Sequence, residues 1–256
     1  MRLLRLALGA ALCLAALPAA EPDWPAVKQE AADILADLVR LETAQPDGNE
    51  ILAARYLRDK LTAEGIESRI LGPTPERASI VARIKGNGSK RPLLLLGHLD
   101  VVAVERHEWS FDPFGGEIKD GIIYGRGTGD DKGVVTGSLL SFILLKRLNV
   151  PLDRDVIFLG VADEEAGGTH GITWLLENHR ELIDAELAIN EGGAGVFDRD
   201  VNYIRFEVQT AEKTHAVSTS KLRVPPATAR SRWRTTRSAR WPAPLDACST
   251  TKPPPV

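Results

Sequence analysis

Residues 93–96 are four consecutive leucines, and turn-forming residues precede them at Gly86-Asn87-Gly88. An apolar run this short, bounded by turn signals, is typical of a strand that is buried on both faces of a parallel sheet. Residues 156–162 and 185–189 form two further runs of this kind. A chain with such strands has to cover both faces of the sheet with helices.

Helical segments alternate with these runs. Four segments have helical length and spacing of apolar residues: 24–41, 50–64, 134–148 and 171–183. Further strands are expected at 80–84 and 203–208, and a hairpin at 115–125 turns at Asp120-Gly121. Buried strands that alternate with helices predict an α/β fold, a three-layer sandwich with a largely parallel central sheet.

The first twenty residues differ from the rest of the chain. Arg2 and Arg5 precede an apolar run from residue 6 to residue 17, and Pro18-Ala19-Ala20 follows it. This order is typical of a secretory signal peptide that is removed near Ala20, although a buried N-terminal helix is the alternative. The run is too short to cross a bilayer as a mature helix. The expected location is therefore secreted or periplasmic, with no membrane attachment after signal removal.

The character of the chain changes after about residue 213. Residues 216–256 contain seven of the sixteen prolines and eight Lys or Arg residues against one acidic residue, Asp246. Neither a strand nor a helix period is present, so this segment offers little apolar surface to offset chain entropy. We expect a domain over residues 21–213 and an anomalous, disordered tail over 214–256. The composition of this segment is compatible with a basic tail. It is also compatible with loss of the reading frame near residue 214.

Charge and cysteine content exclude several classes of protein. A formal net charge of -3 gives no reason to expect nucleic acid or an anionic membrane as a partner. Cys13 and Cys248 are the only two cysteines, so neither a disulfide framework nor a cysteine-rich zinc site is expected. Any metal must be held by His, Asp and Glu.

Four polar clusters stand at or near the carboxyl ends of expected strands, where open α/β sheets place their sites. They are Gly97-His98-Leu99-Asp100, the loop 125–133, Ala162-Asp163-Glu164-Glu165 and Asn190-Glu191-Gly192-Gly193. Each cluster alone has an ordinary structural explanation as a turn, a loop or a solvated rim. Together, however, they bring carboxylates to one edge, where these repel each other unless cations neutralise them. One imidazole with several carboxylates suits zinc or a related divalent ion.

Competing motifs do not fit the same residues. The glycines of the loop 125–133 do not match the dinucleotide-binding fingerprint, and Asp131-Lys132-Gly133 is not a phosphate-binding loop, which needs Gly-Lys followed by Ser or Thr. No Gly-x-Ser-x-Gly nucleophile motif occurs in the chain. A site for a divalent metal remains the best interpretation of these residues.

The four clusters, in this order, resemble the signature of the zinc-dependent aminoacylase/carboxypeptidase family. This family includes glutamate carboxypeptidases, carboxypeptidase S, aminoacylases, carnosinase-type dipeptidases and acyl-diaminopimelate deacylases. The resemblance extends over residues 30–212 or so and includes the segments 109–114 and 120–127. The segment 190–193 most resembles the carboxypeptidase S branch.

The resemblance implies a centre with two zinc ions, for which cobalt or manganese can substitute. His98 and Glu191 would bind one ion, Glu165 would bind the other, and Asp130 would bridge both. These four residues are the expected metal ligands.

The resemblance also implies catalytic roles for two further carboxylates. Glu164 would act as the general base that takes a proton from a zinc-activated water and passes it to the leaving amine. Asp100 would orient the His98 ring. The implied function is hydrolysis of an amide bond in an N-acyl amino acid, a dipeptide or the C-terminal residue of a peptide.

The chain departs from the family pattern in two respects. The family has a lid domain, through which its homodimers form, and a later His that completes the shell of the second metal. After Glu191 the only His is His215. We therefore expect an incomplete catalytic domain without hydrolase activity of its own. The alternative function is an inactive zinc-binding remnant, and a metal-independent binding domain is a third class, which leaves the acidic edge unexplained.

Overall fold

The computed structural model describes residues 21–198 and 202–207. The expected signal peptide at 1–20, the expected boundary at residue 213 and the tail at 214–256 lie outside these ranges. Within them, none of the helices combines the length and the apolarity that a bilayer-spanning segment needs.

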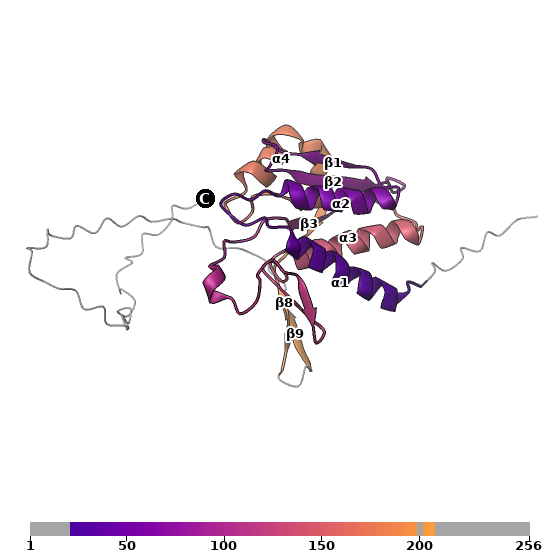
Figure 1. Cartoon of the computed structure of the whole chain (residues 1–256). Helices are drawn as coiled ribbons and strands as arrows, with labels where there is room; N and C mark the ends of the chain where they lie inside the picture. The colour runs from indigo at the N-terminus through magenta and orange to yellow at the C-terminus, as the bar shows by residue number, and fades with distance from the viewer. Residues whose placement is uncertain (1–20, 199–201, 208–256) are drawn as a thin grey trace, which may run out of the picture. The chain divides into compact units, whose positions relative to one another are not determined.

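A five-stranded sheet, which includes the labelled strands β1, β2 and β3, lies behind the helices in Figure 1. Its strand order is β1-β2-β6-β3-β7. Its strands are β1 (Ser68–Leu71), β2 (Ser79–Ile84), β3 (Leu93–His98), β6 (Val156–Val161) and β7 (Leu187–Ile189). β3 pairs in parallel with β6 and β7, whereas β2 pairs antiparallel with β1 and β6. β1, β3, β6 and β7 therefore run in one direction and β2 in the other, which confirms the largely parallel sheet.

Three helices cover one face of this sheet: α1 (Trp24–Arg40), α2 (Ile51–Ala63) and α3 (Lys132–Arg147) (Figure 1). α1 begins where sequence signals place it, because the Asp23 side chain accepts a hydrogen bond from Ala26 N at 3.2 Å. The helices bury their apolar faces in one cluster with β2, β3 and β6. Phe142 of α3 and Phe158 of β6 pack at its centre, with ring centroids 5.9 Å apart.

The opposite face carries a smaller layer, so the sandwich has three layers. α4 (Trp174–Asn178) and α5 (Arg180–Ile183) pack Leu175 and Ile183 against apolar residues of β2, β3 and β6. The prediction of one helix over 171–183 is wrong: a π-helical turn, η2 (Thr169–Thr173), precedes two short helices. Gly171 has non-helical torsions, and a Cβ atom there would lie 1.7 Å from Ala162 O. Close approach to Ala162, just after β6, therefore accompanies the kink at Gly171, and the helix is interrupted a second time at His179, where φ is -145°.

Burial of the third apolar run was also wrongly predicted. β7 is an edge strand whose one neighbour in the sheet is β3, and its side chains are exposed. No described element covers it, which explains why an apolar run at this position is not buried.

Two hairpins complete the described fold. β4 (Glu117–Lys119) and β5 (Ile122–Tyr124) form the expected hairpin about Asp120-Gly121. β8 (Ala194–Phe197) pairs antiparallel with β9 (Tyr203–Glu207). A short 3-10 turn, η1 (Arg106–Glu108), lies between β3 and β4. β9 was expected, whereas β1 and β8 were not.

Parallel pairing brings the polar clusters together. His98 at the end of β3 pairs with Val161 at the end of β6, so residues 98–100 and 162–165 leave the sheet side by side. The start of α3 is fixed by Lys132, a fully buried residue whose Nζ donates to Leu38 O at 2.9 Å and Leu41 O at 2.7 Å. The loop before α3 is thereby held against the end of α1.

Candidate metal centre

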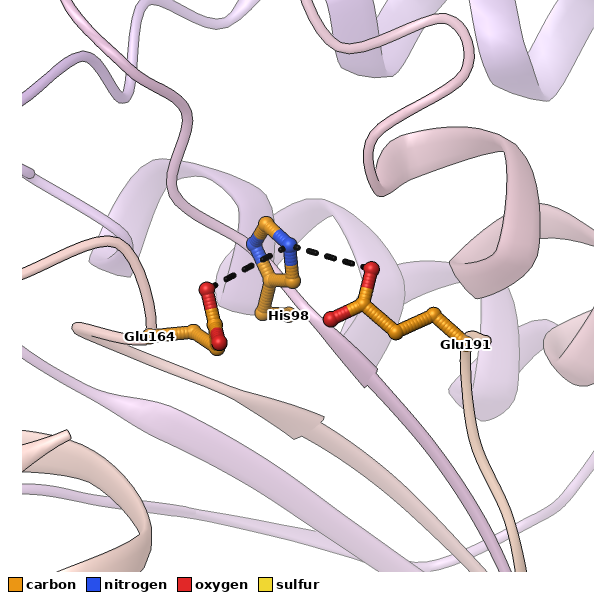
Figure 2. Close-up of side chains that lie close together, drawn as sticks. All are labelled: His98, Glu164 and Glu191. Carbon is orange, nitrogen blue, oxygen red and sulfur yellow. Dashed lines mark ion pairs between the residues drawn. The ribbon is translucent and has the colours of Figure 1, made fainter. Parts of the chain in front are cut away.

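His98 lies at the centre of the candidate site and is only 2% exposed. Its Nδ1 lies 3.0 Å from the backbone carbonyl oxygen of Asp100, to which it donates. Its Nε2 faces three carboxylates, at 2.8 Å from Asp130, 3.9 Å from Glu164 and 3.8 Å from Glu191. Figure 2 shows the carboxylates of Glu164 and Glu191 on opposite sides of the ring. Nε2 is therefore the atom available for a cation.

The charge around His98 favours a cation at this position. Burial alone lowers the pKa of His98, but the hydrogen bond to Asp100 and the charges of Asp100 and Asp131 outweigh it and raise the pKa to about 10. The surrounding carboxylates therefore favour a second proton, on Nε2 of the ring. A divalent ion would displace that proton and neutralise more of the surrounding negative charge.

The Asp100 carboxylate contacts both the turn that carries Glu164 and Glu165 and the ring of His98. Its Oδ1 accepts from Glu164 N at 3.0 Å, and its Oδ2 accepts from Glu165 N at 3.1 Å and Gln45 Nε2 at 2.6 Å. Its Oδ1 lies 3.4 Å from His98 Nδ1, farther than its own backbone carbonyl oxygen. Burial raises the pKa of this carboxyl, but the hydrogen bonds from His98 and Gln45 bring it below its usual value. Asp100 therefore fixes the turn that carries Glu164 and Glu165 as well as contacting the ring.

Asp130 and Asp131 lie in the glycine-rich loop 125–133, and the peptide bond between them is cis. Asp130 is exposed and points at His98, whereas Asp131 is buried and its Oδ2 accepts from His98 N at 2.9 Å. Burial raises the pKa of Asp131 to about 7. A Cβ atom at Gly97 would lie 2.8 Å from Asp131 Oδ2, so a glycine is needed at the end of β3. Asp131 was not expected to contribute, although it stands inside the predicted loop.

The structure brings all five expected ligand and base residues together. Two sets have ligand atoms within 4.8 Å of one another: His98 with Asp130 and Glu165, and His98 with Glu164 and Glu191. The side chains come from the end of β3, the loop before α3, the turn after β6 and the loop after β7. Because Glu164 lies as close to Nε2 as Glu191 does, geometry alone does not separate base from ligand. The roles of these residues remain predictions.

The donor set fits a divalent metal. One imidazole nitrogen with several carboxylate oxygens is a combination that zinc, cobalt and manganese accept. Burial and the nearby charge of Asp130 raise the pKa of Glu165 above its usual value. Such crowding of carboxylates is relieved when a cation lies between them.

Two residues outside the predicted clusters also contact the site. Gln45 binds Asp100, as described above, and Arg77 forms an ion pair with Asp163, the residue before Glu164. Gln45 lies before α2 and Arg77 lies in the loop before β2. Neither stands in a motif, so only the folded structure reveals their contact with the site.

Residues 94–237 of the chain match Peptidase family M20/M25/M40. The chain belongs to this family, which confirms the expected relationship to zinc-dependent aminoacylases and carboxypeptidases. Members of this family are enzymes that act as metallopeptidases or amidohydrolases.

Similar proteins agree with this membership. The chain is 35% identical over 172 residues to a probable succinyl-diaminopimelate desuccinylase of Staphylococcus aureus, covering 66% of this chain and 42% of that protein. It is 35% identical over 144 residues to an N-formyl-4-amino-5-aminomethyl-2-methylpyrimidine deformylase of Halalkalibacterium halodurans, covering 55% of this chain and 34% of that protein. The chain therefore spans less than half the length of these relatives.

Solved structures show the same fold. An M20 family metallo-carboxypeptidase, Sso-CP2 from Sulfolobus solfataricus, is 26% identical with a TM-score of 0.57, over 67% of this chain and 39% of that one. Human carnosine dipeptidase 1 is 22% identical with a TM-score of 0.53, over 65% of this chain and 38% of that one, and supports the fold alone.

Proposed function

We propose that this chain carries the metal-binding part of an amide hydrolase that acts on N-acyl amino acids or small peptides. The convergence of Asp130, Glu164 and Glu191 on Nε2 of the buried His98 is the observation that carries this proposal. Family membership supports it, as do the names of the relatives: a desuccinylase, a deformylase and a metallo-carboxypeptidase. The N-terminal features described above favour a secreted or periplasmic protein.

In this proposal, some residues bind metal and Glu164 transfers the proton. His98, Asp130, Glu165 and Glu191 would hold two divalent ions, which we assign as zinc. When bound, these ions would supply polarisation of the scissile carbonyl and a lowering of the pKa of water towards ~7. Glu164 is half exposed, within reach of incoming water and substrate. It takes the proton from the attacking water and delivers it to the nitrogen of the leaving amine.

Metal binding without turnover is the second candidate function. Both ligand sets in the described part of the chain depend on the same imidazole, that of His98. A second ion would therefore have only carboxylates of its own from these residues. Catalytic zinc is usually held by three protein ligands, so this ion would be bound more weakly.

The substitution Glu164→Gln tests the proposal. It removes the proton acceptor but keeps the shape of the side chain, so we expect this chain to keep its bound zinc. The same change in a full-length homologue should lower turnover of N-acyl amino acids or dipeptides roughly 10²–10⁴-fold. Metal content is measured by atomic emission on both proteins, and hydrolysis rates are measured on the homologue and on the unmodified chain. Glu177→Gln, on the exposed side of α4, is the matched control and should change neither.

Three other results are informative. Loss of zinc in Glu164→Gln would identify Glu164 as a ligand. Zinc binding by the unmodified chain without any hydrolysis would favour the second candidate. Absence of zinc binding would contradict both.

A further inference from the structure

Asp163, the residue before Glu164, hydrogen-bonds across the turn that carries Glu164 and Glu165. Asp163 has a positive φ of 68°, and its backbone oxygen accepts from Gly168 N at 2.6 Å. Its buried carboxylate accepts from His170 N at 2.8 Å and lies 3.0 Å from His170 Nδ1. Asp163 therefore determines the path of the chain from the end of β6 to residue 170.

Arg77 holds Asp163 in place. Its side chain is only 12% exposed, and its guanidinium forms ion pairs with Asp163 and with Glu50 at 3.2 Å. It also donates to Pro46 O at 3.0 Å and to Gln45 Oε1 at 3.3 Å. Glu50 in turn accepts from Asp163 N at 3.1 Å. The loop before β2, the loop before α2 and the turn after β6 thus meet at one guanidinium.

A second route leads from Arg77 to the same turn. Gln45, which accepts from Arg77, donates to Asp100 Oδ2 at 2.6 Å. Asp100 accepts from the backbone N–H groups of Glu164 and Glu165. The Arg77 side chain therefore supports the turn in two ways: directly through Asp163, and through Gln45 and Asp100.

The chain leaves space for this guanidinium. Gly48 has a φ of 66°, and a Cβ atom there would lie 2.5 Å from Arg77 Nη1. Arginine suits this position because its planar fork reaches several acceptors at once, whereas lysine offers a single point charge.

We propose that Arg77 is a positioning residue that fixes the turn of Asp163, Glu164 and Glu165 and thereby sets the affinity of the site for metal. The link to metal affinity rests on the proposed function. The effect on the turn does not, because it depends only on the hydrogen bonds of the metal-free chain.

Hydrogen exchange of the metal-free full chain tests the effect on the turn. In Arg77→Lys, which keeps the positive charge, we expect the amides of Glu164, Glu165 and His170 to exchange at least tenfold faster. The matched control is Arg83→Lys, because Arg83 is also partly buried and paired with a carboxylate, that of Asp155 at 3.0 Å. This control should leave residues 163–170 unchanged. Unchanged exchange in Arg77→Lys would overturn the proposal.

A second variant covers the case in which Arg77→Lys unfolds, which faster exchange throughout β6 would reveal. Gln45→Met breaks only the route through Asp100 and leaves the ion pairs of Arg77 intact. We expect faster exchange at Glu164 and Glu165 with unchanged exchange in β6. Unchanged exchange at both amides would overturn the proposal.

Titration with Co²⁺, followed by its visible absorption, tests the link to metal. Residues that orient metal ligands typically contribute 10–100-fold to affinity, so Arg77→Lys should bind Co²⁺ about tenfold more weakly than the unmodified chain and Arg83→Lys equally well. Faster exchange with unchanged Co²⁺ affinity would overturn the effect on metal. If the unmodified chain binds no Co²⁺, the proposed function fails, and the exchange experiment still decides the role of Arg77.

Discussion

The sheet face beneath α1, α2 and α3 differs from the segment that contains β7, β8 and β9 in how apolar side chains are used. Between these helices and the sheet, Leu38 of α1, Leu57 of α2 and Phe158 of β6 are fully buried. In the later strands, Leu187 is 56% exposed and Phe206 is 66% exposed. Both regions contain strands rich in apolar residues, but only the first is covered by other described elements.

Residues of the candidate metal centre come from both regions. His98, Glu164 and Glu165 leave the ends of β3 and β6, which lie inside the covered sheet. Glu191 follows β7, whose side chains are exposed. Most of the site is therefore attached to a packed core, and one expected ligand is attached to an uncovered edge. The following predictions compare the two regions.

The largest effect is expected from substitutions of phenylalanine in the two regions. Phe158→Ala removes a fully buried ring that packs against Phe142, and should lower the free energy of unfolding by about 3–5 kcal/mol. Phe206→Ala removes a ring that is mostly exposed, and should change the free energy of unfolding by less than about 0.5 kcal/mol. Urea unfolding of the full chain measures both. Equal losses would show that β9 is packed as firmly as β6.

The same comparison explains how much of the fold followed from the sequence. The runs at 93–96 and 156–162 were correctly expected to be buried, because both lie in the interior of the sheet. The run at 185–189 has the same local pattern but lies at the edge. Burial depends on which elements pack against a strand, and a local pattern does not contain that information. The kink at Gly171 likewise depends on its close approach to Ala162, in the turn after β6.

For the site, the expected metal ligands were predicted from the sequence, whereas the residue that supports them was not. His98, Asp130, Glu165 and Glu191 were expected to meet because each belongs to a motif near the carboxyl end of a strand. Arg77 was not expected, since its partner Asp163 lies 86 residues away and ordinary ion pairs have no sequence signature. Supporting residues of this kind are found only when the packing is known.

A smaller effect, dependent on pH, is expected inside the covered region at Asp155, which precedes β6. Burial alone would raise the pKa of Asp155, but hydrogen bonds from Lys85, Gly86 N and Arg83 lower it from 3.8 to about 2. A carboxyl with a lowered folded-state pKa stabilises the fold above its unfolded pKa and loses this contribution as the pH falls through the folded value. Stability from Asp155 is therefore complete above pH 4 or so and is lost towards pH 2.

Asp155→Asn tests this dependence. At pH 7 the variant should be less stable than the unmodified chain by about 2 kcal/mol, and the difference should shrink as the pH falls from 4 towards 2. Urea unfolding at a series of pH values measures it. Asp59→Asn is the control, because its pair with Arg58 is largely exposed and should contribute little at any pH. A difference that stays constant with pH would contradict the ion-pair explanation.

The smallest effect on stability is expected at β7, where the consequence should be seen in association instead. Leu187→Lys places a charge on an exposed apolar residue of an edge strand. The free energy of unfolding should change by less than about 0.5 kcal/mol, because little packing is lost. Exposed apolar edge strands promote pairing between chains, and lysine opposes it, so sedimentation velocity should show less self-association. Thr62→Lys adds the same charge to the exposed surface of α2 and should leave association unchanged. A similar decrease in both variants would attribute the effect to net charge and not to the uncovered edge.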